Sequence, residues 1–289
     1  AQADWFAEAL NETSGGDISV QVFPDSQLGK LQELAEAVSL GTIAFSHNTA
    51  GALGSLYQPF AALDTPYLYR DVDHLMKVTD VESPVMQELS AGLIAAANVR
   101  VIYAHYFGSR NLTCNQAILS PADLAGLKIR AVPFPIYTTA VEGMGAVAIP
   151  VDWSEVPTAL ATGVVQGQEN PVNVVLNHKI YEVQSHLMLT GHMSNAEVVV
   201  MNEDAWQALT EAQKEAVREA ANQIREKATN AILDNEESET QKLRDLGMTV
   251  IGADEGLQLD AFRLSVKALV DKRFGTEYGD LYTKIAAIS

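Results

Sequence analysis

The sequence predicts an α/β protein with mainly parallel sheets, and two observations support this fold class. Short apolar or alternating runs, typical of strands, alternate along the chain with longer runs of helical spacing. Such alternation is typical of folds in which helices cover a parallel sheet. At 289 residues the chain also exceeds one ordinary core, so we expect two domains of roughly 100–150 residues each.

Nine segments have the composition and spacing of strands. They lie at 18–23, 42–48, 99–105, 111–113, 128–132, 164–168, 188–190, 196–201 and 249–251. The run 106–110, which contains Gly108, leaves the third strand, so 99–105 and 111–113 are predicted as separate strands. Pro133 halts the strand at 128–132, and the glycines of 51–54 predict a loop.

Helical segments fill most of the remaining chain. They lie at 4–10, 31–40, 71–90, 136–144, 155–162, 203 to about 246, and most of the chain after 251. Gly41 ends the second helix, and Pro84 predicts a break within the third. Ser120 is placed to cap a short helical turn, and Ser154 to cap the fifth helix. The run from Glu203 is long enough to span two domains and act as a hinge.

Composition excludes some classes of partner. Hydrophobic residues make up 47% and charged residues 19% of the chain, as in an ordinary globular protein. The 19 basic and 37 acidic residues give a formal charge of −18. Because phosphate binding needs clustered Lys and Arg, nucleic acid is not an expected partner. An anion site in such an acidic protein has to be built locally.

Cys114 is the only cysteine, which excludes an intramolecular disulfide and a thiolate metal cluster. No run of eighteen or more apolar residues suggests a membrane-spanning segment. The chain opens directly on a helical run, which suggests that a leader, and with it a first strand, has been removed.

Polar side chains fall where predicted strands end. Arg130 closes the segment Gly126-Leu-Lys-Ile-Arg130, Asn170 follows the strand at 164–168, and Arg110, Asn48 and Thr49 hold similar positions. Ligands of parallel α/β sheets bind beyond the carboxyl ends of the strands. Because a buried arginine needs an anionic partner, this pattern predicts a site for a small anion.

Six motifs together resemble the DctP-type solute-binding proteins of tripartite ATP-independent periplasmic (TRAP) transporters. They are Phe23-Pro-Asp-Ser-Gln-Leu-Gly29, Leu63-Asp-Thr-Pro-Tyr-Leu-Tyr-Arg-Asp71, Gly108-Ser-Arg-Asn-Leu-Thr113, Leu124-Ala-Gly-Leu-Lys-Ile-Arg130, Trp153-Ser-Glu-Val156 and Gly167-Gln-Glu-Asn-Pro171. The resemblance covers nearly the whole chain, and the combination is specific although each motif alone is weak.

The resemblance implies a two-domain periplasmic binding protein with a ligand cleft between the domains and a long helix bridging them. The expected first domain comprises 1–107 plus about 196–234, and the second 108–195 plus about 235–289. The resemblance further implies a periplasmic location, a carboxylate ligand and delivery of that ligand to the permease subunits of a TRAP transporter. It also implies a monomeric protein that has no cofactor and is not an enzyme. Family members usually begin with a strand before the first helix, and contacts from that strand cannot be assigned in this sequence.

The resemblance also assigns roles to single residues. Arg130 matches the arginine that pairs bidentately with the ligand carboxylate, and Arg110 matches one that assists it. Asn170 matches a ligand-contacting asparagine, and Trp153 an aromatic residue beside the ligand. A planar guanidinium suits the two oxygens of a carboxylate. The alternatives are structural ion pairs for the arginines, a turn cap for Asn170 and domain packing for Trp153.

The sequence determines the chemical class of the ligand less closely than it determines these residue roles. Asn48, Thr49 and His47 near Trp153 favour a hydroxylated acid, so a sugar acid such as a uronate is the main prediction. A four-carbon dicarboxylate, whose second carboxylate Arg110 would serve, is the alternative, followed by a keto or aromatic acid. Lys30-Leu31 and Asn48-Thr49 stand where relatives that bind sialic acid carry acidic residues, which counts against that ligand.

Two histidines are further candidates for ligand contacts, and an enzyme is the rival hypothesis for function. His47 and His192 are candidates for hydrogen bonds to ligand hydroxyls, with a core position as the alternative. The six histidines show no tight ligand spacing, so no metal site is expected. A lyase or isomerase acting on the same acids is the rival from another class. No Ser-His-Asp or Cys-His arrangement and no cofactor motif supports it.

Overall fold

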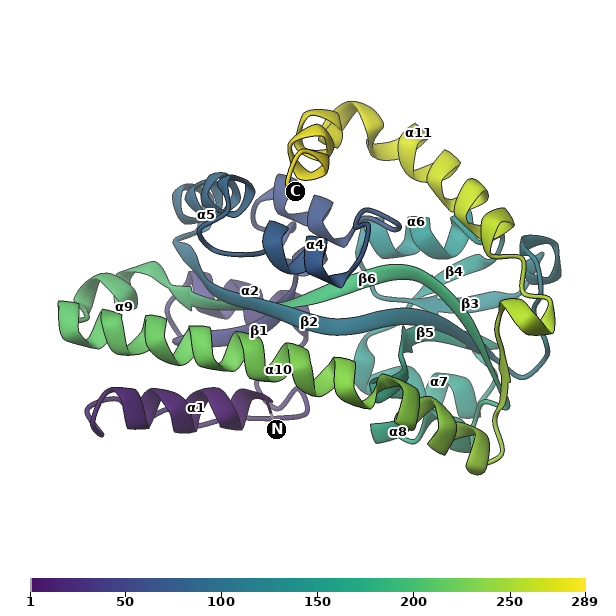
Figure 1. The fold of residues 1–289 in the computed structure, drawn as a ribbon, viewed down its shortest axis with the longest axis horizontal. Helices are drawn as coiled ribbons and strands as arrows, with labels where there is room; N and C mark the ends of the chain where they lie inside the picture. Colours follow the sequence, from purple (N-terminus) through teal and green to yellow (C-terminus); the bar gives the residue numbers. More distant parts are fainter. Residues whose placement is uncertain (1) are drawn as a thin grey trace.

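A computed structural model describes residues 2–289, which adopt the predicted α/β fold (Figure 1). The strands are β1 (Phe45–Thr49), β2 (Val99–Cys114), β3 (Lys128–Ala131), β4 (Val147–Pro150), β5 (Gly167–Pro171), β6 (His186–Asn202) and β7 (Thr249–Ile251). The α-helices are α1 (Gln2–Thr13), α2 (Leu31–Ser39), α3 (Ala50–Leu53), α4 (Val72–Val78), α5 (Pro84–Ala97), α6 (Pro135–Gly143), α7 (Val156–Ala161), α8 (Val172–Asn177), α9 (Glu203–Ala208), α10 (Glu211–Asp245) and α11 (Leu259–Ala286). Short 3₁₀ helices are η1 (Gln58–Asp64), η2 (Pro121–Leu124), η3 (Trp153–Glu155), η4 (Ile180–Glu182) and η5 (Ala253–Glu255).

The seven described strands form one mixed sheet in the order β1-β6-β2-β5-β3-β4, with β7 beside β6. The prediction of mainly parallel sheets is therefore wrong. β6 pairs antiparallel with β1 and β2, and β2 pairs antiparallel with β5, while only the β3–β4, β3–β5 and β6–β7 pairs are parallel. The two long antiparallel strands, β2 and β6, thus connect the two halves of the sheet. One half contains β1, and the other contains β3, β4 and β5.

β2 and β6 each unite two strands that the sequence separated. The pairing of β2 with β6 shifts register between Tyr106 and Gly108 and again between Arg110 and Leu112. Gly108 has φ +127°, and a Cβ there would lie 2.6 Å from Cβ of Pro171 on β5. The glycine that seemed to end a strand therefore marks a bulge, at which the ladder is disturbed and the strand continues. Arg110, predicted at a strand end, consequently lies inside β2.

Three other local predictions are corrected. Residues 18–23 form no strand, the predicted loop at 51–54 contains most of α3, and Asn170 lies within β5 instead of following it. The helix predicted at 71–90 is broken before Pro84, which is the first residue of α5. Proline is well tolerated in the first helical turn. The N-cap residue Ser83 accepts a hydrogen bond from the Met86 N–H.

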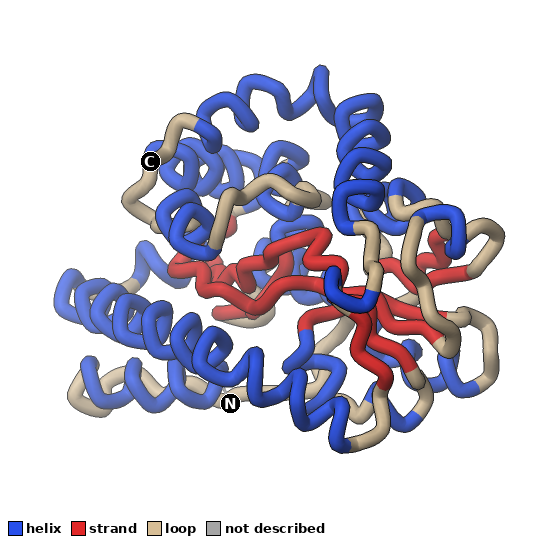
Figure 2. Tube along the Cα trace, turned by 45° about the vertical axis from the view of Figure 1, so that its right-hand side comes forward, coloured by secondary structure: helices blue, strands red, loops and turns tan. Residues whose placement is uncertain are grey.

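Helices lie on both sides of the strands (Figure 2). The 35-residue α10 runs along the sheet beside β2, contacting α1 near one end and α8 and β7 near the other (Figure 1). The long helical run predicted from Glu203 thus contains a helix that bridges both halves of the sheet. α11 packs on α6 and also reaches η1 and α5.

Candidate ligand-binding site

A cavity of about 190 Å³ lies where the two halves of the sheet meet. It is lined by Ser26, Lys30, Leu31, Thr49, Phe107, Arg110, Arg130, Val132, Pro133, Asp152, Trp153, Ser154, Asn170, Val174, His178 and Glu197. We call this cavity the cleft pocket. Five of the eight residues predicted to contact a ligand line it: Arg130, Arg110, Asn170, Trp153 and Thr49.

Arg130 lies in β3, with 2% of its surface exposed. Its Nε donates a hydrogen bond to the Val151 carbonyl (2.8 Å), and its guanidinium carbon is 5.8 Å from the centre of the Trp153 ring. Among residues 2–289, no carboxylate lies within 4.0 Å of the guanidinium. Burial lowers the pKa of Arg130 to about 10, so the side chain stays charged at neutral pH. The pocket therefore contains a buried cation that still needs an anion.

Arg110 is neutralised within the protein. Its Nε and Nη2 contact the Glu169 carboxylate, Nη2 also donates to the Glu169 carbonyl (2.6 Å), and Nη1 contacts Oδ1 of Asn195 (3.4 Å). Burial alone would lower the pKa of Arg110, but Glu169 raises it. This geometry agrees with the structural alternative for Arg110, although part of the side chain still lines the pocket.

Glu169 connects Arg110 to His192. His192 Nε2 lies 3.1 Å from Oε2 of Glu169, and its Nδ1 lies 2.8 Å from Oγ1 of Thr190. Burial would raise the pKa of Glu169, but Arg110 and His192 lower it to about 2. His192 is fully buried and does not line the pocket, so the structure places it behind Arg110 as a support for Glu169.

Asn170 and Trp153 form further parts of the wall. Asn170 donates from Nδ2 to Oε1 of Gln168 (2.6 Å), and its oxygen is therefore turned away from that bond. Trp153, in η3, packs edge-to-face against His178 with ring centres 4.9 Å apart. The aromatic ring and the free amide oxygen give the pocket one apolar and one polar surface beside Arg130.

Thr49, at the end of β1, also lines the cleft pocket. Its side chain caps α3 by accepting a hydrogen bond from the Ala52 N–H (3.1 Å). Asn48 faces away from the pocket: its Nδ2 donates to the Leu31 carbonyl, and its Oδ1 accepts from the Thr49 N–H, both at 3.0 Å. His47 does not line the pocket either. Neither of these two predicted residues therefore lines the cleft pocket.

Three charged lining residues were not predicted. Lys30 and Asp152 face each other from the two halves of the fold, with Nζ and Oδ2 2.6 Å apart. Glu197 lies on β6 opposite Thr49, and burial raises its pKa to about 7. The sequence signal for Lys30 was its position directly after Gln-Leu-Gly, whereas Glu197 belongs to no motif and depends on the pairing of β6 with β1.

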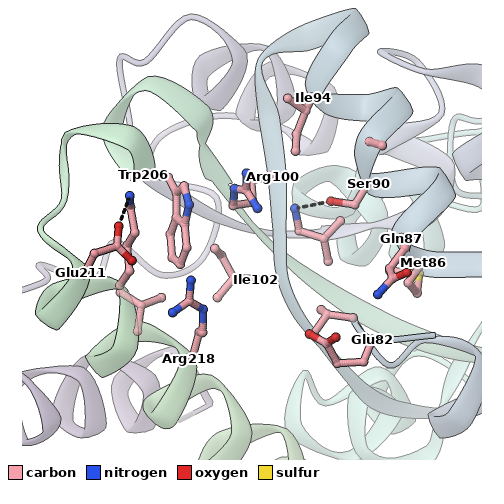
Figure 3. Close-up of a pocket in the computed structure, with 15 residues that line it drawn as sticks. Glu82, Met86, Gln87, Ser90, Ile94, Arg100, Ile102, Trp206, Glu211 and Arg218 are labelled. Carbon is pink, nitrogen blue, oxygen red and sulfur yellow. Dashed lines mark hydrogen bonds and ion pairs between the residues drawn. The ribbon is translucent and has the colours of Figure 1, made fainter. Parts of the chain in front are cut away.

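A second, larger cavity of about 570 Å³ lies between α5, the start of β2 and the start of α10 (Figure 3). Arg100 and Arg218 both lie beside Trp206, with guanidinium carbons 5.1 and 5.4 Å from the ring centre. We call it the Trp206 groove. Its basic side chains are all paired: Arg100 with Glu203, Lys214 with Glu211, and Arg218 with Glu215.

Within residues 2–289, no group of three or more His, Cys, Asp or Glu side chains is arranged to hold a metal ion. None of the helices in that range combines the length and apolar character needed to cross a membrane. Cys114 is buried in the core, and burial raises the pKa of its thiol.

Comparison with known proteins confirms the resemblance found in the sequence. The family model of bacterial extracellular solute-binding proteins, family 7 (DctP), matches residues 1–277. A solute-binding protein of Verminephrobacter eiseniae is 35% identical over 278 residues, which cover 94% of this chain and 81% of the relative.

Solved structures give the same result. A TRAP periplasmic solute-binding protein from Roseobacter denitrificans, with bound L-galactonate, has a TM-score of 0.91 and 30% identity, covering 99% of this chain and 93% of its own. One from Xanthobacter autotrophicus, with bound β-D-galacturonate, has a TM-score of 0.90 and 27% identity, covering 100% and 95%. The chain therefore belongs to the DctP family of extracellular solute-binding proteins, which work with TRAP membrane transporters.

Proposed function

We propose that this protein captures a sugar acid, a uronate or an aldonate, in the periplasm and delivers it to the permease of a TRAP transporter. One observation carries the proposal: Arg130 is a buried guanidinium without an acidic partner within the described residues, and it faces a small cavity. A ligand carboxylate would supply the missing charge through two parallel hydrogen bonds.

The size and lining of the cleft pocket support a small hydroxylated acid. Its volume of about 190 Å³ is below the usual range of about 300–1,000 Å³ for ligand sites, which favours compact acids over large ones. Trp153 offers a flat apolar surface for a sugar ring, and Asn170, Thr49 and Glu197 offer polar groups for hydroxyls. The neighbours from Roseobacter and Xanthobacter that bind L-galactonate and β-D-galacturonate support the same ligand class.

The dicarboxylate alternative needs a second free cation. Arg110 is the candidate for that role, but its charge is neutralised by Glu169. Lys30 is paired with Asp152. Both pairs would have to open before either cation could bind a second carboxylate, and this favours a monocarboxylate.

We further infer that the ligand is enclosed by closure of two domains, 1–107 plus about 196–234 and 108–195 plus about 235–289. The boundary at 107/108 coincides with one of the three register shifts between β2 and β6, and a strand bends easily at such a bulge. Closure would bury the ligand against Arg130, and the permease would recognise the closed form. The protein acts as a monomer and without catalysis in this proposal.

The test is a thermal-shift screen of uronates, aldonates, dicarboxylates and keto acids, followed by calorimetric titration. A monocarboxylic sugar acid should raise the unfolding temperature most and bind at a ratio of one per chain. A dicarboxylate as the strongest ligand would overturn the assignment of ligand class. Conversion of a bound acid into a product would overturn the non-catalytic role.

A further inference from the structure

Polar side chains without partners gather behind the wall of the cleft pocket. Nε2 of His47, the hydroxyl of Tyr103 and both ring nitrogens of His105 are buried and have no hydrogen-bond partner among residues 2–289. The ring of His105 lies 6.0 Å from the rings of both His47 and Tyr103. The four atoms therefore form one cluster, and no other part of the described chain has such a concentration.

Strand pairing places this cluster next to the pocket. Glu197 on β6 lies opposite Thr49 on β1 and opposite His105 on β2. His47 and Tyr103 occupy the next row of the same face, on either side of a β6 residue. Directly opposite residues on one face have Cβ atoms about 5 Å apart. Thr49 and Glu197 line the pocket, so the cluster begins one side chain behind its wall.

The other side of the cluster is apolar. Tyr103 packs against Phe6 of α1, with ring centres 5.3 Å apart, in a hydrophobic core that includes α1 and α10. Because buried polar groups are nearly always satisfied by protein, water or ligand, the cluster calls for partners, and the cleft pocket lies next to it.

The chemistry of the cluster suits hydroxyl groups. Burial lowers the pKa of His47 to about 4 and that of His105 to about 3, so both imidazoles are neutral at neutral pH. A neutral imidazole offers one hydrogen-bond donor and one acceptor, and a phenol hydroxyl can also donate and accept. Such groups pair with alcohols, which also donate and accept, whereas a carboxylate is better served by Arg130.

We propose that His47, Tyr103 and His105, reached past Thr49 and Glu197, form a hydroxyl-recognition subsite that selects polyhydroxylated acids. The proposal rests on the proposed function, because it assumes that an acid is anchored at Arg130. The carboxylate end of the ligand binds the guanidinium, and its hydroxyl end, directly or through water, satisfies the buried histidines and tyrosine.

Tyr103→Phe and His105→Phe test the subsite. The probes are D-galacturonate and tetrahydropyran-2-carboxylate, a ring acid without hydroxyls, titrated by calorimetry into each variant and into the unaltered protein. Removing an unpartnered buried hydroxyl or imidazole should leave the ligand-free protein as stable as before or more so. Affinity for D-galacturonate should fall about threefold in Tyr103→Phe and about tenfold or more in His105→Phe. Affinity for the hydroxyl-free acid should change less than about twofold.

His74→Phe is the matched control. His74 is also a buried histidine, but both of its ring nitrogens have partners, the Arg70 N–H (3.2 Å) and the Ile285 carbonyl (3.0 Å). This substitution should lower stability and leave the ratio of the two affinities unchanged. The subsite is refuted if Tyr103→Phe and His105→Phe retain the galacturonate affinity, or if they weaken both acids equally. Failure of the unaltered protein to bind any acid would instead refute the proposed function.

Discussion

The two cavities of this protein differ in how they treat positive charge. In the Trp206 groove, each basic lining residue contacts a carboxylate, including Arg100, which makes two hydrogen bonds to Glu203. The cleft pocket has about one third of the volume, and it contains Arg130, for which no acid within residues 2–289 supplies a partner.

If the cleft pocket is the ligand site, as we propose, charge balance identifies that site better than cavity volume does. A guanidinium already paired with a carboxylate gains little by exchanging it for the carboxylate of a ligand. An unpaired, buried guanidinium gains a full charge-assisted interaction. The Trp206 groove therefore offers an anionic ligand no unpaired cation, whereas the cleft pocket offers Arg130.

Arg130→Ala should have the largest effect, because it removes the cation that the ligand is proposed to neutralise. Loss of one partner of a buried charge pair costs about 2–5 kcal/mol, so affinity for D-galacturonate should fall at least about thirtyfold. Arg130→Lys keeps the charge but loses the planar fork, and binding should still be severely weakened. Calorimetric titration measures both effects.

Arg100→Ala is the matched change in the Trp206 groove. It leaves Glu203 without its partner and exposes one face of Trp206, so stability should fall by about 1–3 kcal/mol. The affinity for D-galacturonate should not change. If Arg100→Ala weakened binding as much as Arg130→Ala, the contrast between the cavities would be wrong.

The fold was predictable where local patterns decide it. The helices at α2 and α6 and the short strands β3 and β7 follow from spacing and from turn residues such as Gly41 and Pro133. The continuity of β2 and β6 was not predictable, because a glycine inside a bulge has the same local signal as a glycine at a strand end. Gly108 stays in the strand because it pairs with Asn195 of β6, which is distant in the sequence.

The site was predictable only in part, for a similar reason. Arg130 and Trp153 belong to motifs, and both line the cleft pocket. The pairing of Arg110 with Glu169 joins residues 59 positions apart, and no motif encodes whether that arginine is free. Glu197 and His105 meet only because β6 lies beside β2. Charge pairing across strands is a tertiary property that single segments do not contain.

Glu169→Gln should produce the largest loss of stability among these variants. It leaves Arg110 buried without a carboxylate, which costs about 3–5 kcal/mol. The pKa of Glu169 is about 2 in the folded protein, below its usual value of 4.5. The stability that it contributes is therefore present above about pH 4.5 and is lost as the pH falls towards 2.

Urea unfolding of the unaltered protein and of Glu169→Gln, between pH 3 and pH 7, measures this dependence. The difference in unfolding free energy should be largest at neutral pH and should shrink as the pH falls below about 4.5. Glu203→Gln in the Trp206 groove provides the comparison, since its carboxylate is less buried and its pKa is lowered less strongly. An equal difference at pH 3 and pH 7 would show that Glu169 does not act through its charge.

The smallest expected effect concerns Lys30 and Asp152, which face each other at the cleft pocket from opposite halves of the fold. On the proposal that the two domains close around the ligand, this pair forms on closure, so Lys30→Ala or Asp152→Ala should speed dissociation of D-galacturonate about two- to fivefold, as expected for an exposed ion pair. The exchanged pair Lys30→Asp with Asp152→Lys should restore slow dissociation, and added salt should reduce all differences. Lys214→Ala breaks a comparable ion pair at the Trp206 groove and should leave the dissociation rate unchanged. Stopped-flow fluorescence measures these rates, and an unchanged rate in both single variants would mean that this ion pair does not hold the pocket closed.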